Sequence, residues 1–231
     1  MGRALTIDER DHLEDVGKHY DRTMMLETRA RTRRAMASIA AEIKSGMIEE
    51  DAMDLARRTL KSAGMLRGWH AIHVRFGENT LKPFGAPSEP GVKLRDDDIF
   101  FIDIGPVWQQ WEGDAGETYV VGNDPEMQRI ARDVKVIFAD VRNQWKVNRL
   151  TGAALYEYAA RRAVSLGWRL NLDMNGHRLA DFPHAAIHKG ALAATTFIPA
   201  TDLWVLEIQI RHPYGSFSAF YEDLLLDDDG R

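Results

Sequence analysis

The chain of 231 residues has no cysteine, no long apolar run and no excess of basic residues. The absence of cysteine excludes disulfides, thiolate zinc sites and cysteine nucleophiles, and it fits a reducing compartment. No apolar run approaches the roughly 18–20 residues that a membrane span requires. The N-terminal sequence MGRALTIDERDHLEDVGKHY is charged and lacks the apolar segment of a signal peptide. We therefore expect a cytoplasmic protein that has no membrane partner.

The charge balance limits the class of partner. The chain has 30 Lys and Arg against 35 Asp and Glu, a formal net charge of −5. A general nucleic-acid binder is usually basic, so this mild acidity argues against nucleic acid as a partner. Hydrophobic residues make up 45% and charged residues 28%, which is a balance typical of globular proteins and not of disordered ones.

The residue patterns predict helices first and a cluster of strands afterwards. The chain reads as helical from residue 8 to about 62. Apolar spacings of three and four predict a helix within 28–48, with Gly46 as its stop, and a second helix over 49–63. Two more helices are expected at 124–146 and 151–166. Strand patterns lie at 70–77, 98–105, 111–122, 202–211 and 217–226. This order indicates an α+β fold with an antiparallel or mixed sheet.

Three carboxylates stand inside apolar strand sequences. Asp103 lies in IFFIDI, Glu207 in LWVLEI and Glu222 in FYEDLLL. A lone buried carboxylate costs several kcal/mol, so each is expected to be paired, protonated or bound to a metal. Taken alone, each acid could also occupy a solvent-facing strand position or a buried ion pair. Together with Asp114 and the nearby histidines, the set favours divalent cations, which prefer carboxylate and imidazole ligands.

The order of these residues resembles a known family. Asp103 and Asp114 are followed by Gly176-His177, then His184, then Glu207 and Glu222. This order is similar to that of the methionine aminopeptidase, aminopeptidase P, prolidase and creatinase family, which has the pita-bread fold. The Gly46-Met47-x-Glu49 junction and the HVRFGEN segment at 73–79 are also similar to the family's opening region.

The resemblance predicts the domain organisation. It covers residues 28–228 and corresponds to the catalytic domain only, a curved antiparallel or mixed sheet covered by helices. Residues 1–27 are then an N-terminal helical extension, and 229–231 are a tail. We expect a homodimer, although no residue pattern marks an interface.

The resemblance also implies a role for each site residue. Asp103 would chelate one of two divalent ions, Asp114 and Glu222 would bridge them, and His177 and Glu207 would complete the shell of the second. Manganese, cobalt, iron and zinc all fit. A water held between the ions would be the nucleophile, with Glu207 accepting its proton and His184 contacting the scissile group. His70 and His73 flank the start of a strand, and alternation places His73 on the same side as Arg75, so we take His73 as a further catalytic candidate.

Several neighbours of the ligands depart from the family pattern. Residues 81–102 contain no histidine, and Phe84 stands near the place where the peptidase branches have one. Glu117 replaces an arginine after the second aspartate. Arg178-Leu179-Ala180 follows His177 in place of a glycine-rich sequence, and Ile208-Gln209 follows Glu207 in place of Pro-Gly. The ligands are kept while the residues that shape the substrate pocket differ.

Three functions follow from this reading. The leading one is a metal-dependent hydrolase that cleaves an amide or related C–N bond in a short peptide or small amino-acid derivative. The second is a metal-free creatinase-like hydrolase of a small nitrogenous substrate, against which four converging carboxylates argue because they repel one another. The third is a non-catalytic module that binds peptide or protein, for which retention of all five ligands is not expected.

Overall fold

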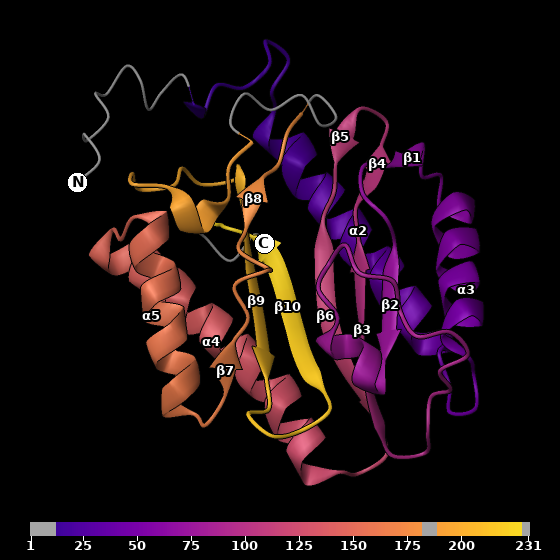
Figure 1. Cartoon of the computed structure of the whole chain (residues 1–231). Coiled ribbons are helices and arrows are strands. Elements are labelled where there is room, and N and C mark those ends of the chain that lie inside the picture. Colours follow the sequence, from indigo (N-terminus) through magenta and orange to yellow (C-terminus); the bar gives the residue numbers. More distant parts are fainter. Residues whose placement is uncertain (1–12, 182–188, 228–231) are drawn as a thin grey trace.

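The computed structural model describes residues 13–181 and 189–227 (Figure 1). Four long helices are present in these ranges, together with two short 3₁₀ turns. Asp21 caps the helix that begins at Arg22 by accepting a hydrogen bond from the Thr23 N–H. Asp124 caps the helix that begins at Pro125 by accepting from the Glu126 and Met127 N–H groups, and Pro125 is its first residue. The helical elements are α2 (Arg22–Glu42), α3 (Glu49–Ser62), η1 (Gly77–Leu81), α4 (Pro125–Asn148), α5 (Gly152–Ser165) and η2 (Leu192–Ala194).

The strands form one large sheet and one small sheet, and all pairs are antiparallel. The seven-stranded sheet has the order β2 (His73–Phe76), β3 (Asp98–Ile104), β6 (Ala115–Val121), β10 (Ser218–Leu224), β9 (Trp204–Arg211) and β7 (Arg169–Leu170), with β8 (His177–Arg178) also paired to β9. The small sheet has the order β1 (Arg67–Gly68), β4 (Pro106–Trp108) and β5 (Trp111–Glu112).

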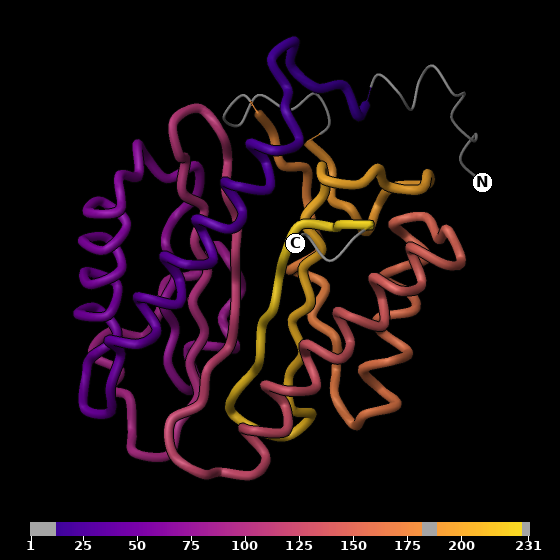
Figure 2. The backbone as a smooth tube through the Cα atoms, turned by 180° about the vertical axis from the view of Figure 1, so that it is seen from behind, coloured from indigo at the N-terminus to yellow at the C-terminus, as the bar shows by residue number. Residues whose placement is uncertain are grey.

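The helices cover one face of the large sheet. In Figure 1 and from behind in Figure 2, α2 and α3 lie over the β2–β3–β6 half, and α4 and α5 lie over the β9–β10 half. Each half has its own apolar core. Ile39 of α2 packs with Ile102 of β3, whereas Val134 and Ile137 of α4 pack with Ile208 of β9. The side chains that alternate with these strand residues therefore point to the opposite face, away from the helices.

Most of the predicted elements are present, with two exceptions. The strand expected over 111–122 is divided into β5 and β6, which lie in different sheets. The helix expected to stop at Gly46 ends earlier, at Glu42. Gly46 has a φ of +89° and its N–H donates to the Leu94 carbonyl, while Ile48 pairs with Lys93. Tertiary pairing thus overrides the helical pattern after Glu42. The helix also begins at Arg22, before the predicted domain start at residue 28, and the domain limits stay a prediction.

The two opening motifs of the sequence meet in the structure. The buried Glu49 carboxylate accepts from the Phe76 N–H at 2.6 Å and from Asn79 Nδ2 at 3.0 Å. Asn79 Nδ2 also donates to the Glu89 carbonyl, and its Oδ1 accepts from the Glu89 N–H. These contacts join the start of α3 to the end of β2 and to the loop that follows, so both motifs stabilise the fold.

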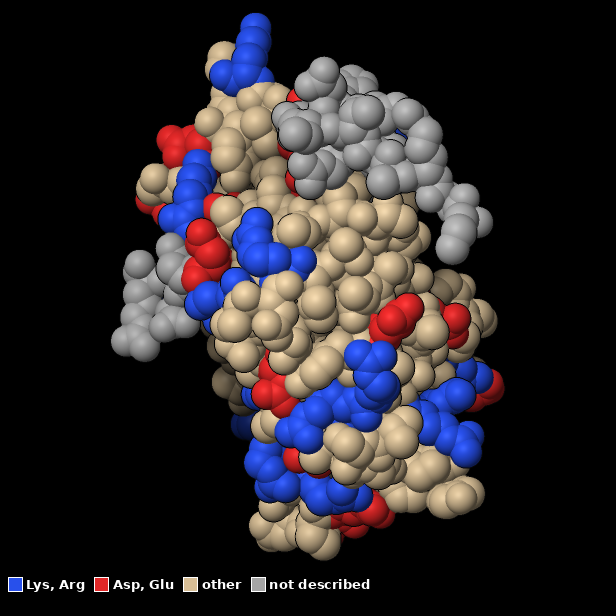
Figure 3. Space-filling view, turned by 90° about the vertical axis from the view of Figure 1, so that its left-hand side faces the viewer, with Lys and Arg blue, Asp and Glu red and all other residues tan. Residues whose placement is uncertain are grey.

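Ion pairs join the helical layer to the sheet and occupy the outer surface. Arg29 of α2 binds Asp223 of β10 at 2.6 Å, and Arg33 binds Glu117 of β6 at 3.0 Å. On the face formed by α4 and α5, Lys and Arg gather in the lower half among Asp and Glu (Figure 3). Between these two helices, Arg162 pairs with Asp140 at 2.7 Å. Among the described residues, no helix combines the length and apolar content needed to cross a bilayer.

Candidate metal centre

Strand register places three carboxylates in one row across the large sheet. Asp103 pairs with Gly116, Gly116 pairs with Glu222, and Glu222 pairs with Glu207. Because the residues next to them in sequence enter the apolar cores under the helices, these carboxylates face the opposite side. The residues in those cores are Ile102, Ile104, Leu206 and Ile208.

Gly116 provides the space for this row. A Cβ at this position would lie 2.3 Å from Phe220 Cε1 and 2.7 Å from Glu222 Oε1. Both distances are shorter than real Cβ contacts, so a side chain here would displace the Phe220 ring and the Glu222 carboxylate. The row thus contains three carboxylate-bearing strands, with Asp103 on one side of Gly116 and Glu222 and Glu207 on the other.

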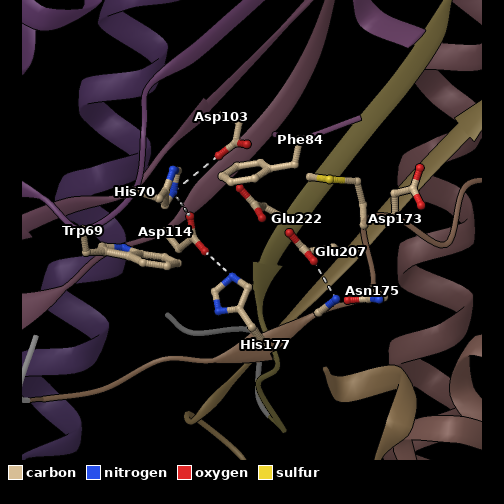
Figure 4. Close-up of a pocket in the computed structure, with 12 residues that line it drawn as sticks. Trp69, His70, Phe84, Asp103, Asp114, Asp173, Asn175, His177, Glu207 and Glu222 are labelled. Atoms are coloured by element: carbon tan, nitrogen blue, oxygen red, sulfur yellow. Dashed lines mark hydrogen bonds and ion pairs between the residues drawn. The ribbon is translucent and has the colours of Figure 1, made fainter. Parts of the chain in front are cut away.

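Asp114, just before β6, stands between two histidines (Figure 4). Its Oδ1 is 3.3 Å from His70 Nε2, and its Oδ2 is 2.9 Å from His177 Nε2. His70 Nε2 is also 3.5 Å from Asp103 Oδ1. The Asp114 carboxylate is buried, and each of its oxygens faces one of the two imidazoles.

Glu207 and His177 are held by the backbone around β8 and β9. Glu207 Oε2 accepts from the Gly176 N–H at 2.6 Å, and the Tyr156 hydroxyl donates to the Glu207 carbonyl at 2.9 Å. Gly176 has a φ of +72° and a Cβ there would lie 2.7 Å from the Val205 carbonyl, so a residue with a side chain would be strained. These contacts fix the direction of the Glu207 carboxylate.

The carboxylates of the site are buried close together, which disfavours their charged forms. Burial raises the pKa of Asp103 to about 7, with Asp114 adding to the effect, and burial together with the Asp114 and Asp103 charges raises the pKa of Glu222 well above its usual range. Burial lowers the pKa of both histidines, but the carboxylates outweigh it: the pKa of His70 rises to about 9 and that of His177 to about 10. The imidazolium groups therefore supply positive charge that a cation could supply instead.

The donor set fits divalent ions. The described residues include two groups of potential ligands, His70 with Asp103 and Asp114, and Asp114 with His177 and Glu222. Within each group, the ligand atoms lie within 4.8 Å of one another. Glu222 Oε1 is buried and has no hydrogen-bonding partner among the described residues. Carboxylate oxygens and imidazole nitrogens suit borderline ions such as zinc and cobalt, and the shared Asp114 suits a pair of them.

A cavity of about 310 Å³ opens beside this donor set. Apolar side chains form part of its wall, and the buried carboxylates and the imidazoles of the donor set form another part. Its lining residues are Trp69, His70, Phe84, Asp103, Asp114, Asp173, Met174, Asn175, Gly176, His177, Glu207 and Glu222 (Figure 4). Cavities of this size hold small ligands.

Arg75 fixes one wall of the cavity. This buried side chain donates to the carbonyls of Lys82, Pro83, Phe84 and Ala86 at 2.5–3.2 Å. The loop is thereby held with the Phe84 ring against the rings of His70 and His73, at centroid distances of 5.7 and 4.7 Å. Phe84 is the residue that stands near the place where the family resemblance suggested a histidine.

Comparison with known proteins agrees with this site. The model of metallopeptidase family M24 matches residues 23–226. The chain belongs to metallopeptidase family M24. The predicted family is therefore confirmed, and the family binds divalent metals. Among curated proteins, none matches the chain.

Solved structures show the same fold as this M24 chain. An X-Pro aminopeptidase from Thermotoga maritima matches with a TM-score of 0.72 and 17% identity, over 93% of this chain and 60% of that one. A dipeptidase from Pyrococcus horikoshii matches with a TM-score of 0.76 and 19% identity, over 97% and 62%. A methionine aminopeptidase from Thermotoga maritima matches with a TM-score of 0.71 and 16% identity, over 93% and 96%. The predicted α+β pita-bread fold is confirmed. The chain spans about three fifths of the first two proteins and almost all of the third.

The structure brings most of the predicted site residues together. All five predicted ligands, Asp103, Asp114, His177, Glu207 and Glu222, line the one cavity. His73 lies beside it, where its ring faces Phe84 and its Nε2 has no hydrogen-bonding partner among the described residues; burial lowers its pKa to about 4. His184 lies outside the described residues. The roles given to these residues stay predictions.

The sequence reasoning gave His70 no role in the site. This histidine follows β1, and it reaches the site because Arg67 and Gly68 pair with Val107 and Pro106 of β4. A two-residue strand has too few positions to show an alternating pattern. In the sequence, the one feature that marks His70 is its place beside Trp69, just before the strand at 73–76.

The departures from the M24 pattern have structural partners. Glu117 faces the helices, where it pairs with Arg33 and with Lys135. Arg178 is buried and donates to four backbone carbonyls, including those of residues 14 and 15. Gln209 Nε2 donates to the Thr80 carbonyl and to Ser218 Oγ. These residues stabilise the fold around the site.

Proposed function

We propose that the protein is a metal-dependent hydrolase that cleaves an amide or related C–N bond in a short peptide or small amino-acid derivative. The observation that carries this proposal is the buried Asp114 carboxylate, shared by two groups of potential ligands beside an open cavity. Asp103, Asp114, His177, Glu207 and Glu222 would hold two divalent ions. When bound, such ions lower the pKa of water and polarise a carbonyl oxygen.

The chain's own groups have separable tasks in this reaction. Glu207 lines the cavity and is held by the Gly176 N–H through one oxygen, so its other oxygen is the natural acceptor for a proton. Trp69, Phe84 and Met174 form an apolar wall for the substrate's side chain. We keep His184 and His73 as candidates for contact with the scissile group.

The size of the cavity limits the substrate. A volume of about 310 Å³ lies at the lower end of the range for small-molecule sites, about 300–1,000 Å³. A dipeptide or a similar amide fits such a volume, whereas a folded protein substrate does not. The X-Pro aminopeptidase, dipeptidase and methionine aminopeptidase that share the fold support a peptide substrate. Manganese, cobalt, iron and zinc remain candidates, and we propose a cytoplasmic homodimer that needs neither nucleic acid nor membrane.

The test is a hydrolysis screen on metal-stripped protein. The protein is reloaded separately with each of the four metals and incubated with dipeptides and small amides, and released amine is quantified by mass spectrometry. We expect turnover with at least one metal. Glu222→Gln should lower the rate by at least about 100-fold, because loss even of residues that support metal ligands costs 10–100-fold. Glu157→Gln, on the exposed side of α5, is the matched control and should keep the wild-type rate.

Two outcomes would select the other readings. Equal turnover by stripped and loaded protein would contradict the metal-dependent mechanism and favour the metal-free creatinase-like hydrolase. Tight binding of peptides without turnover under any metal would favour the binding module. In both cases Glu222→Gln and Glu157→Gln would behave alike in the hydrolysis assay.

A further inference from the structure

We propose that His70 is a further metal ligand that binds the same ion as Asp103 and Asp114. Each of the two ions then has one imidazole, one from His70 and one from His177. This inference rests on the proposed function and extends the ligand set by one residue from outside the large sheet. It also assigns nitrogen ligation to the Asp103 side, which the five predicted ligands left with carboxylates alone.

The contacts around Asp114 are symmetric. The two oxygens of this carboxylate point to different imidazoles, with His70 Nε2 at 3.3 Å and His177 Nε2 at 2.9 Å. Each imidazole has a second carboxylate in its own group, Asp103 for His70 and Glu222 for His177, with the ligand atoms within 4.8 Å of one another. The two groups have the same composition, one histidine and two carboxylates. If one group is a metal site, the other has the same donor chemistry.

Both histidines hold a proton on Nδ1. His177 Nδ1 lies 3.0 Å from the Arg178 carbonyl oxygen, and His70 Nδ1 lies 2.7 Å from the Ala71 carbonyl oxygen. A carbonyl only accepts, so Nδ1 carries a proton in both rings, whether the ring is charged or neutral. Nε2 is the nitrogen that can coordinate a cation once its own proton is displaced, and in both rings Nε2 is the atom that faces Asp114. Metal-binding histidines typically donate the other ring N–H to such a partner.

The surrounding residues position the His70 ring. The Trp69 indole packs edge-on against both imidazoles, at centroid distances of 4.4 Å to His70 and 5.0 Å to His177, and its Nε1 donates to the Gly113 carbonyl. Gly105 makes room for the ring, because a Cβ there would lie 2.1 Å from His70 Cδ2. One tryptophan therefore orients both proposed nitrogen ligands, and a glycine at the end of β3 permits the approach of His70.

His73 is the contrasting residue. It lies close in sequence and also contacts Phe84, yet its nitrogen atoms belong to neither group of ligand atoms.

The presence of His70 would also affect which metal is bound. An imidazole in each group favours zinc or cobalt over manganese more strongly than carboxylates alone.

The test measures cobalt binding by metal-stripped wild type, His70→Ala and His73→Ala, through visible absorption and competition with a chelator. Wild type should bind two ions. His70→Ala should bind one of them at least about tenfold more weakly and change the absorption spectrum. His73→Ala should match wild type in both readouts. Unchanged affinities and an unchanged spectrum in His70→Ala would overturn the proposal, even if its hydrolysis rate falls.

A second measurement avoids any dependence on how well the variant folds. In long-range ¹H–¹⁵N spectra of wild type titrated with zinc, the Nε2 signals of both His70 and His177 should shift while each Nδ1 stays protonated. A shift confined to His177 would overturn the assignment of His70 and leave the proposed function standing. A wild-type protein that binds no ion would overturn the proposed function itself, and with it this ligand.

Discussion

Gly116→Ala is the substitution whose effect follows most directly from the geometry of the site. The new methyl group would lie 2.3 Å from Phe220 Cε1, so the ring would have to retreat by at least about 0.7 Å to reach the 3.0 Å limit of real Cβ contacts. Phe220 is fully buried and packs against Phe101 and Met174, so this movement would have to displace these neighbours too. Overpacking of this kind costs about 1–3 kcal/mol. For a chain of this size, that corresponds to a fall in melting temperature of about 2–12 °C in the metal-free protein.

The same methyl group should also weaken metal binding. It would lie 2.7 Å from Glu222 Oε1, the buried oxygen that has no partner among the described residues. If displacement of this carboxylate weakens an ion by tenfold, saturating metal contributes about 1.4 kcal/mol less stability, or about 3–6 °C less rise in melting temperature.

The assay is thermal unfolding of wild type, Gly116→Ala and Gly85→Ala, each with and without saturating metal. Gly85 is the matched control, since a Cβ there meets nothing within 4 Å. Gly85→Ala should melt like wild type in both conditions. The reasoning is refuted if Gly116→Ala keeps both the wild-type melting temperature and the full rise on metal addition.

Three further predictions concern the residues around the site. Arg75→Met removes the charged group that donates hydrogen bonds to four loop carbonyls. A hydrogen bond to a charged group contributes about 1.5–3 kcal/mol, so we expect the free energy of unfolding in urea to fall by about 3 kcal/mol or more. Proteolysis of the 82–90 loop should also become faster. Tyr156→Phe removes the hydroxyl that donates to the Glu207 carbonyl and should cost about 1–3 kcal/mol in the same assay; a change below about 0.5 kcal/mol would contradict a structural role for this bond. In the metal-free protein, the pKa values of His70 and His177 are raised to about 9 and 10, so the stability from their charged forms is complete below about pH 6.5 and is lost as the pH rises through 9–10. Scanning calorimetry should then show metal-free protein melting lower at pH 9.5 than at pH 6.5, and a larger rise on metal addition at the higher pH.

The strands of the site could be predicted because their chemistry is unusual. Asp103, Glu207 and Glu222 interrupt apolar runs, and a carboxylate in such a run needs a special partner. Once the order of the ligands was recognised, the fold followed from the family. The sequence did not assign these acids to a face of the sheet; in the structure, strand alternation places all three on the face opposite the helices.

Register and loop contacts could not be predicted in the same way. Nothing in the sequence states that Gly116 stands between Asp103 and Glu222, since register depends on the pairing of strands that are far apart in the chain. The same limit applies to Arg75, whose four partners lie in a loop without periodic pattern.

His70 illustrates how long-range contacts create part of a site. Its position depends on the β1–β4 pairing, on the Trp69 hydrogen bond to the Gly113 carbonyl and on the space beside Gly105. Each of these contacts joins residues 67–70 to residues 105–113, which are far apart in the sequence. Local propensity and spacing, which predicted the helices and long strands, have no access to such contacts.

The most direct test of the central claim is to count the ions by native mass spectrometry after the stripped protein is reloaded with zinc or cobalt. The account predicts two ions per chain in wild type and in Asp140→Asn, which alters a surface ion pair on α4. Asp114→Asn, which removes the charge shared by both groups of ligands, should retain fewer. A wild-type protein that binds a single ion or none, or an Asp114→Asn variant that still binds two with wild-type affinity, would contradict the account.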